Sequence, residues 1–209
     1  MQGQRENGIV IGVVTDLNDP ERLGRVRVKY PHLKDEQSYW ARLVTLMAGP
    51  DRGVRFVPEV NDEVLVAFEH GDPRRSYILG ALWSKADKPP ADDGQPTQNN
   101  WRFIKSRSGH IIRLDDTQGA EKIEIIDRAG SRKVIIDSAA QKIQVICDAG
   151  DVEVKAGTGS VKVEALTVEV KATGNMTLEA TGSTAIKGAT IDINASGPVT
   201  VAGMPIKLN

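Results

Sequence analysis

The residue types that most often carry out chemistry are few and scattered in this sequence. Its three histidines, His32, His70 and His110, lie far apart, and none has a second histidine or a cysteine at metal-ligand spacing. The single cysteine, Cys147, excludes an intrachain disulfide and a cysteine-based zinc site. No G-x-S-x-G, P-loop or G-x-G-x-x-G motif occurs. We therefore expect no catalytic residues, no metal site and no cofactor, and the chain is predicted not to be an enzyme.

Two charged clusters in the sequence are possible functional sites. The adjacent carboxylates of Asp115-Asp116 precede a Thr-Gln-Gly sequence, which indicates a turn rather than a pair of catalytic acids. Arg25, Arg27 and Lys29 form the basic side of one strand, but no aromatic residues are interleaved with them, as a groove for single-stranded nucleic acid would require. The formal net charge of −1 also argues against binding a polyanion. We interpret this basic face as solvated or partner-facing, and expect no nucleic acid ligand.

The composition favours short strands and turns. Of the 209 residues, 40% are hydrophobic but only 4% are aromatic, and 20 are glycine. No apolar run approaches the roughly 18 residues that a membrane helix needs. The N-terminus also lacks the apolar stretch of a secretory signal. We expect a protein made in the cytoplasm without a signal peptide.

Residues 1–84 are predicted to form a small closed barrel. The clearest strand is residues 24–30, where apolar and basic residues alternate strictly. Turn sequences separate the other expected strands, which are residues 9–14, 40–46, 63–68 and 76–83. Five short strands in this length indicate a barrel. Residues 85–100 are polar and rich in proline, and are expected to be a linker.

Residues 101–209 carry a repeat of the form apolar-x-apolar-x-small, with polar residues between the apolar ones. The copies start every 7 to 11 residues, and this spacing shortens toward the C-terminus. Each copy predicts a short strand with one apolar face, followed by a turn. Looser early copies start at Ile112, Ile123, Val134 and Ile143. In the later copies the predicted core residues are Val152, Val154, Val161, Val163, Val168, Val170, Met176, Leu178, Ile186, Ile191, Ile193, Val199 and Val201.

Such a short strand cannot bury its apolar face alone and must stack on neighbouring strands. One possible closure is a solenoid of a single chain, and the other is a prism of three interleaved chains. Solenoids usually have bulkier interiors and a capping element, and the sequence offers neither. The pattern therefore favours a β-helical needle over residues 101–209, formed by three intertwined chains.

The run from Phe56 to Arg75, FVPEVNDEVLVAFEHGDPRR, resembles the OB-fold domain of phage baseplate assembly protein V and of the valine-glycine-repeat spike proteins of type VI secretion. Residues 23–28 (LGRVRV), 77–83 (YILGALW) and 106–116 (SRSGHIIRLDD) continue the resemblance. The family's members are trimeric central spikes of contractile injection machines. The resemblance implies an all-β fold, with an N-terminal OB-fold barrel as collar (1–84), followed by a C-terminal intertwined triple-stranded β-helix in a homotrimer.

The same resemblance implies a structural role, in which the spike punctures the target envelope mechanically and meets that envelope only transiently. The first predicted strand begins a few residues after Met1, so we expect a separate baseplate hub protein at the N-terminal end rather than a hub region in this chain. The linker is too short for the lysozyme domain of some relatives. A phage tail, a tailocin, an extracellular injection particle and a type VI device all fit these residues.

The C-terminal end is predicted to bind another protein. Some short spikes in this family end in a His-x-His metal site, but no histidine follows His110 here. The resemblance then implies a separate PAAR-type tip protein that caps the needle. Its expected contacts are Gly203, Met204, Pro205, Ile206, Lys207, Leu208 and Asn209.

Two other functions remain as alternatives. A trimeric receptor-binding tail fibre would need a tip domain rich in aromatic or polar residues, whereas the sequence ends within the repeat. A carbohydrate-active β-solenoid would need carboxylates clustered on one face. The outward charges of the repeat instead alternate between glutamate and lysine.

Overall fold

The computed structural model describes residues 8–34 and 36–206, and the chain divides into two units, Met1–Val152 and Glu153–Asn209. Strands dominate the first unit. Among the described residues the helical segments are two single 3-10 turns, η1 (Pro31–Leu33) and η2 (Glu69–Gly71). No helix in this part of the chain is long and apolar enough to cross a membrane.

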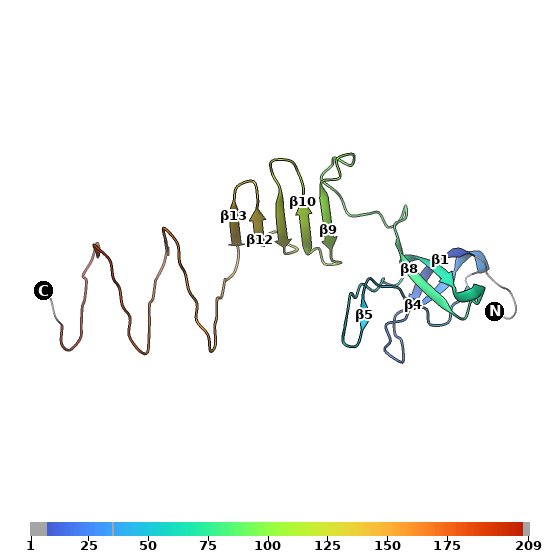
Figure 1. The fold of residues 1–209 in the computed structure, drawn as a ribbon, viewed down its shortest axis with the longest axis horizontal. Coiled ribbons are helices and arrows are strands. Elements are labelled where there is room, and N and C mark those ends of the chain that lie inside the picture. The colour runs from blue at the N-terminus through green and yellow to red at the C-terminus, as the bar shows by residue number, and fades with distance from the viewer. Residues whose placement is uncertain (1–7, 35, 207–209) are drawn as a thin grey trace. The chain divides into compact units, whose positions relative to one another are not determined.

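The N-terminal sheet curls on itself (Figure 1). Its strands run in the order β3-β2-β1-β7-β8-β4, and all pairs are antiparallel except β4 with β8. Val26 and Ala41, which precede β2 and β4, exchange two backbone hydrogen bonds of 3.0 and 2.8 Å and so join the two sides of the sheet. The strands are β1 (Ile9–Asp16), β2 (Arg27–Tyr30), β3 (Glu36–Gln37), β4 (Arg42–Leu43), β7 (Glu63–Phe68) and β8 (Ser76–Leu82). This strand order, with its two ends joined, agrees with the expected OB-type barrel.

Two predicted strands are shorter than expected. Residues 24–30 narrow to β2 because the backbone N–H of Arg25 donates to the Asp19 carboxylate instead of to a neighbouring strand. Residues 40–46 narrow to β4, and the chain then leaves the sheet, so that Leu46 is 95% exposed. The other three predicted strands agree with β1, β7 and β8 to within two residues.

The barrel core is small and consists mainly of valine. Alternate residues of β7 are buried, as expected for a strand with one face inward. Gly12 in β1 allows the sheet to close tightly, because a Cβ atom there would lie 3.0 to 3.1 Å from side-chain carbons of Val28 and Val66. The buried apolar residues are Val14, Val26, Val28, Tyr30, Ala41, Val64, Val66, Phe68 and Ile78.

A second sheet follows in chain order as an antiparallel meander, β13-β12-β11-β10-β9. The two apolar residues of each early copy of the repeat lie within one of its strands, which confirms the strands predicted there. The strands are β9 (Trp101–Lys105), β10 (Ile111–Asp115), β11 (Lys122–Ile126), β12 (Arg132–Asp137) and β13 (Lys142–Cys147). A two-stranded hairpin, β5 (Ala48–Gly49) with β6 (Arg52–Gly53), completes the strands. Residues 85–100 contain no helix or strand.

The second unit contains no strand among its described residues, 153–206, although strands were predicted there. Figure 1 shows this segment, orange to red, running back and forth. The bends fall at residues 157–159, 166, 173–174, 181–182, 189, 196–197 and 204–205, close to the spacing of the repeat. We call each extended segment between two bends a limb. A limb of two apolar residues becomes a strand only when a neighbouring strand pairs with it, and the described part of the single chain supplies no such neighbour.

Val66→Ala is expected to lower the free energy of unfolding of the barrel by about 2 kcal/mol, because it removes two methyl groups from a fully buried position. The loss should appear as faster amide hydrogen exchange in β1, β7 and β8. Val60→Ala, at a position that is 47% exposed, is the matched control and should change exchange little. Equal effects of the two changes would contradict this assignment of the core.

Candidate functional site

One face of the β9–β13 sheet carries two rows of aliphatic side chains that no other described residue covers, with Arg102 opposite Leu114 at the edge of the face. Cross-strand pairing aligns them in two rows, since Ile112 lies opposite both Ile104 and Ile125, and Ile123 lies opposite both Leu114 and Ile136. Their exposed fractions range from 39% to 72%. The rows are Ile104–Ile112–Ile125–Val134–Val145 and Leu114–Ile123–Ile136–Ile143. Contiguous apolar surface of this kind marks an interface.

The opposite face of the same sheet is mixed, because polar residues, some of them paired with one another, alternate there with apolar ones. The apolar residues on this face are Phe103, Ile111, Ile126, Ile135 and Ile146. Arg113 donates hydrogen bonds to Glu124 on the adjacent strand, and its guanidinium lies 4.0 Å from the centre of the Trp101 ring. Asp115, which is also buried, accepts hydrogen bonds from the backbone and hydroxyl of Thr117. Although burial raises the pKa of Asp115, hydrogen bonds from Thr117 and Trp101 hold it below its usual value. The uncovered aliphatic rows on the first face therefore form the candidate interface.

The later copies of the repeat present the same kind of surface. All thirteen predicted core residues, from Val152 to Val201, are more than half exposed in the single chain. The structure therefore brings none of them into a core within one chain, and their burial in a trimer stays a prediction. At the predicted tip contacts, Met204 is 98% exposed and Ile206 48%. Lys207, Leu208 and Asn209 lie outside the described residues.

The side chains that could carry out catalysis or bind a metal do not lie together. Across residues 8–34 and 36–206, no three or more His, Cys, Asp or Glu side chains are placed to hold a metal ion. Asp115 and Asp116 have separate partners, since Asp115 bonds to Thr117 whereas Asp116 forms an ion pair with Arg102. The interpretation of these carboxylates as part of a turn fits this arrangement.

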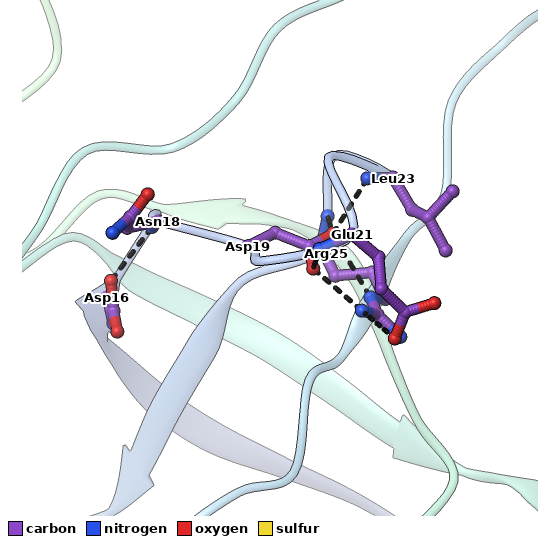
Figure 2. Close-up of polar contacts among 6 residues, drawn as sticks. All are labelled: Asp16, Asn18, Asp19, Glu21, Leu23 and Arg25. Atoms are coloured by element: carbon purple, nitrogen blue, oxygen red, sulfur yellow. Dashed lines mark hydrogen bonds and ion pairs between the residues drawn. The ribbon is translucent and has the colours of Figure 1, made fainter.

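Sequence reasoning missed a carboxylate that organises the loop between β1 and β2. The Asp19 side chain, only 3% exposed, accepts backbone N–H groups of Glu21, Leu23 and Arg25 at 2.9 to 3.3 Å (Figure 2). The Arg25 guanidinium donates to it at 2.6 and 3.1 Å, and also to Glu21 at 2.9 Å. Hydrogen bonds from the Arg25 side chain, and then from the backbone, hold the pKa of Asp19 well below its ordinary value.

The basic strand face was expected to be solvated or partner-facing, and at least two of its three side chains instead have partners within the barrel, while a contact of this face with a partner protein stays a prediction. Arg25 is bound by Asp19 and Glu21, and the Arg27 guanidinium lies 4.7 Å from the centre of the Trp40 ring. The Asn18-Asp19-Pro20 turn sequence was the available signal. It located the turn, but it did not show that Asp19 accepts from residues two, four and six positions later.

The comparisons with known proteins agree with this geometry. Residues 10–83 match the family model of the type VI secretion system/phage-baseplate injector OB domain. The barrel is thus similar to the OB domain of baseplate V proteins and VgrG-type spike proteins. The resemblance seen in the sequence is thereby confirmed, as is the OB-type nature of the barrel.

Two spike proteins illustrate the similarity. The type VI secretion system spike protein VgrG1a of Pseudomonas aeruginosa is 27% identical over 131 residues, which cover 57% of this chain and 20% of that protein. The spike protein VgrG3 of Vibrio cholerae is 24% identical over 123 residues, covering 56% of this chain and 11% of VgrG3. The chain thus spans about a fifth or less of the length of these curated relatives.

Asp19→Asn is expected to destabilise the barrel at pH 7, because it removes the charge that the Arg25 guanidinium and three N–H groups bind. A carboxyl group whose pKa falls on folding stabilises the fold at pH values above its unfolded pKa. That contribution is lost as the pH drops below about 4. The thermal midpoints of the two proteins should therefore converge in acid.

Asp16→Asn is the matched control, since the Asp16 carboxylate accepts one exposed backbone N–H, from Asn18. It should lower the midpoint less than Asp19→Asn at pH 7. A difference between Asp19→Asn and the unmodified protein that stays constant from pH 7 to pH 2 would disprove the role assigned to this carboxylate.

Proposed function

We propose that this chain is the structural central spike of a contractile tail or injection machine, which punctures the target envelope mechanically and makes or breaks no covalent bond. The observation that carries the proposal is the uncovered aliphatic face of β9–β13, whose opposite face is mixed and holds the paired Arg113 and Glu124. Similarity to spike proteins over part of the chain supports the same role. The protein would assemble with a phage tail or a phage-tail-like baseplate.

The occupant proposed for the aliphatic face is two further copies of this chain. Burying apolar surface contributes roughly 25 cal/mol per Å², so a face of nine aliphatic residues provides a substantial driving force for association. In an intertwined triple-stranded β-helix, each limb of residues 153–206 would gain the hydrogen-bonding neighbours that it lacks in one chain. Such an assembly suits force transmission, because opening one strand would break contacts to two other chains.

The proposed organisation is a collar of residues 1–84, a linker of residues 85–100 and a needle of residues 101–209. A separate baseplate hub protein would hold the N-terminal end, and a PAAR-type tip protein would cap the C-terminal end. The exposed side chains of Met204 and Ile206 support a contact at this tip.

Val163→Asp is expected to abolish trimer formation, because three carboxylates would be buried near the axis without partners. Glu164→Lys is the matched control at the adjacent, outward position and should leave assembly unchanged. Light scattering gives the mass of both variants and of the unmodified chain. A stable monomer of the unmodified chain at micromolar concentration would refute the trimer and favour a single-chain solenoid.

Deleting residues 203–209 should leave the trimer intact but abolish binding of a PAAR-type tip protein, since the deletion removes the proposed docking end. The measurement is co-elution of the tip protein with the full-length or the shortened trimer. Equal co-elution with both would place the tip contact elsewhere.

A further inference from the structure

The barrel carries a groove that the spike role does not explain. It lies between the β1–β2 loop, the β5–β6 hairpin and the turn before β8, and seven arginines but only two carboxylates, Asp51 and Glu69, line it. We propose that this groove binds an acidic segment of a partner protein that also carries apolar side chains. The proposal concerns the barrel alone and stands apart from the trimeric needle.

Four of the seven guanidinium groups have no carboxylate partner among the residues that the structure describes. Arg25, Arg74 and Arg75 are each bound to a carboxylate of the barrel. In the described part of the chain, Arg22, Arg52 and Arg55 form no ion pair, and Arg42 contacts the face of the Tyr77 ring, at 5.6 Å from its centre. Stacking leaves the N–H edge of a guanidinium open to a carboxylate. The groove thus holds an excess of unmatched positive charge, although the chain as a whole is nearly neutral.

The β5–β6 hairpin holds its arginines in a defined place. The Thr45 hydroxyl donates to the carbonyl of Val54 at 2.5 Å, across the base of the hairpin. Gly53 has a φ of +157°, and a Cβ atom there would lie 2.7 Å from the carbonyl oxygen of Met47, so the chain path needs glycine. The backbone positions of Arg52 and Arg55, on either side of this segment, are therefore fixed, which lowers the backbone part of the entropic cost of binding a ligand.

Apolar side chains stand beside the charged ones and define the second requirement on the partner. Phe56 and Leu23 in the groove lining are 66% and 65% exposed, and Met47 is 49% exposed. Leu46, next to Met47, is 95% exposed. A segment that alternates carboxylates with leucine or phenylalanine would match both kinds of side chain.

The aromatic residues favour a protein ligand over nucleic acid. Bases bound by an OB barrel stack on exposed aromatic faces. Three aromatic residues line this groove, and one ring face of Trp40 and of Tyr77 is occupied by the guanidinium groups of Arg27 and Arg42, which leaves Phe56 as the exposed ring. Carboxylates, in contrast, pair with guanidinium groups through two parallel hydrogen bonds.

The test uses the full-length protein and a fluorescein-labelled peptide of about twelve residues that alternates glutamate with leucine and phenylalanine. Fluorescence anisotropy should show binding that weakens as salt rises from 50 to 200 mM, because exposed charges are screened. The double variant Arg52→Gln/Arg55→Gln should bind about tenfold more weakly. Arg128→Gln, which removes an exposed arginine outside the groove, is the matched control and should bind within about twofold of the unmodified protein.

Three results would overturn the proposal. The first is equal binding of the peptide by the double variant and the unmodified protein. The second is equal binding of a peptide in which lysine replaces every glutamate, and the third is tighter binding of a single-stranded oligonucleotide of the same net charge. Light scattering and circular dichroism of the double variant complete the test. A folded double variant that no longer trimerises would show that a second copy of the chain fills the groove, which would also refute the proposal.

Discussion

A strand that presents only two aliphatic residues on one face cannot bury them against its own chain. This constraint governs the C-terminal half of the protein, from the exposed rows of β9–β13 to the unpaired limbs of residues 153–206. Lengthening the repeat adds more uncovered surface and no core. The proposed intertwined homotrimer answers the constraint, since the same pairing that covers the aliphatic face would also satisfy the backbone of the limbs.

The two faces of the β9–β13 sheet differ in the side chains that they carry. Arg113, Glu124 and Trp101 form a closed polar contact on one face, where a buried charge has its partner within hydrogen-bond distance. The aliphatic rows lie on the other face, where Arg102 is opposite Leu114 in the edge strand β9. One-residue alternation thus gathers the uncovered aliphatic side chains on one face.

The barrel differs from the C-terminal half because it has a core within one chain, although this core of mostly valine side chains is small. Part of its order comes from polar contacts outside that core. Asp19 fixes the loop between β1 and β2, and the Val26–Ala41 bridge joins the two sides of the curled sheet. The arginine groove lies beside these same elements, so a rigid barrel would position its guanidinium groups for the proposed acidic partner.

The sequence by itself determined the strands that depend on local alternation, including β7 and the strands β10 to β13. It also carried the family resemblance. Period-two patterns and turn residues are local signals, and they need no knowledge of distant neighbours. The tertiary structure alone decided the contacts between separate elements. It shortened β2 and β4, brought Arg113 to Glu124, and gathered the arginines of the β1–β2 loop, the β5–β6 hairpin and the turn before β8 into one groove. These contacts depend on how the sheets curl and pair, which no single segment of sequence encodes.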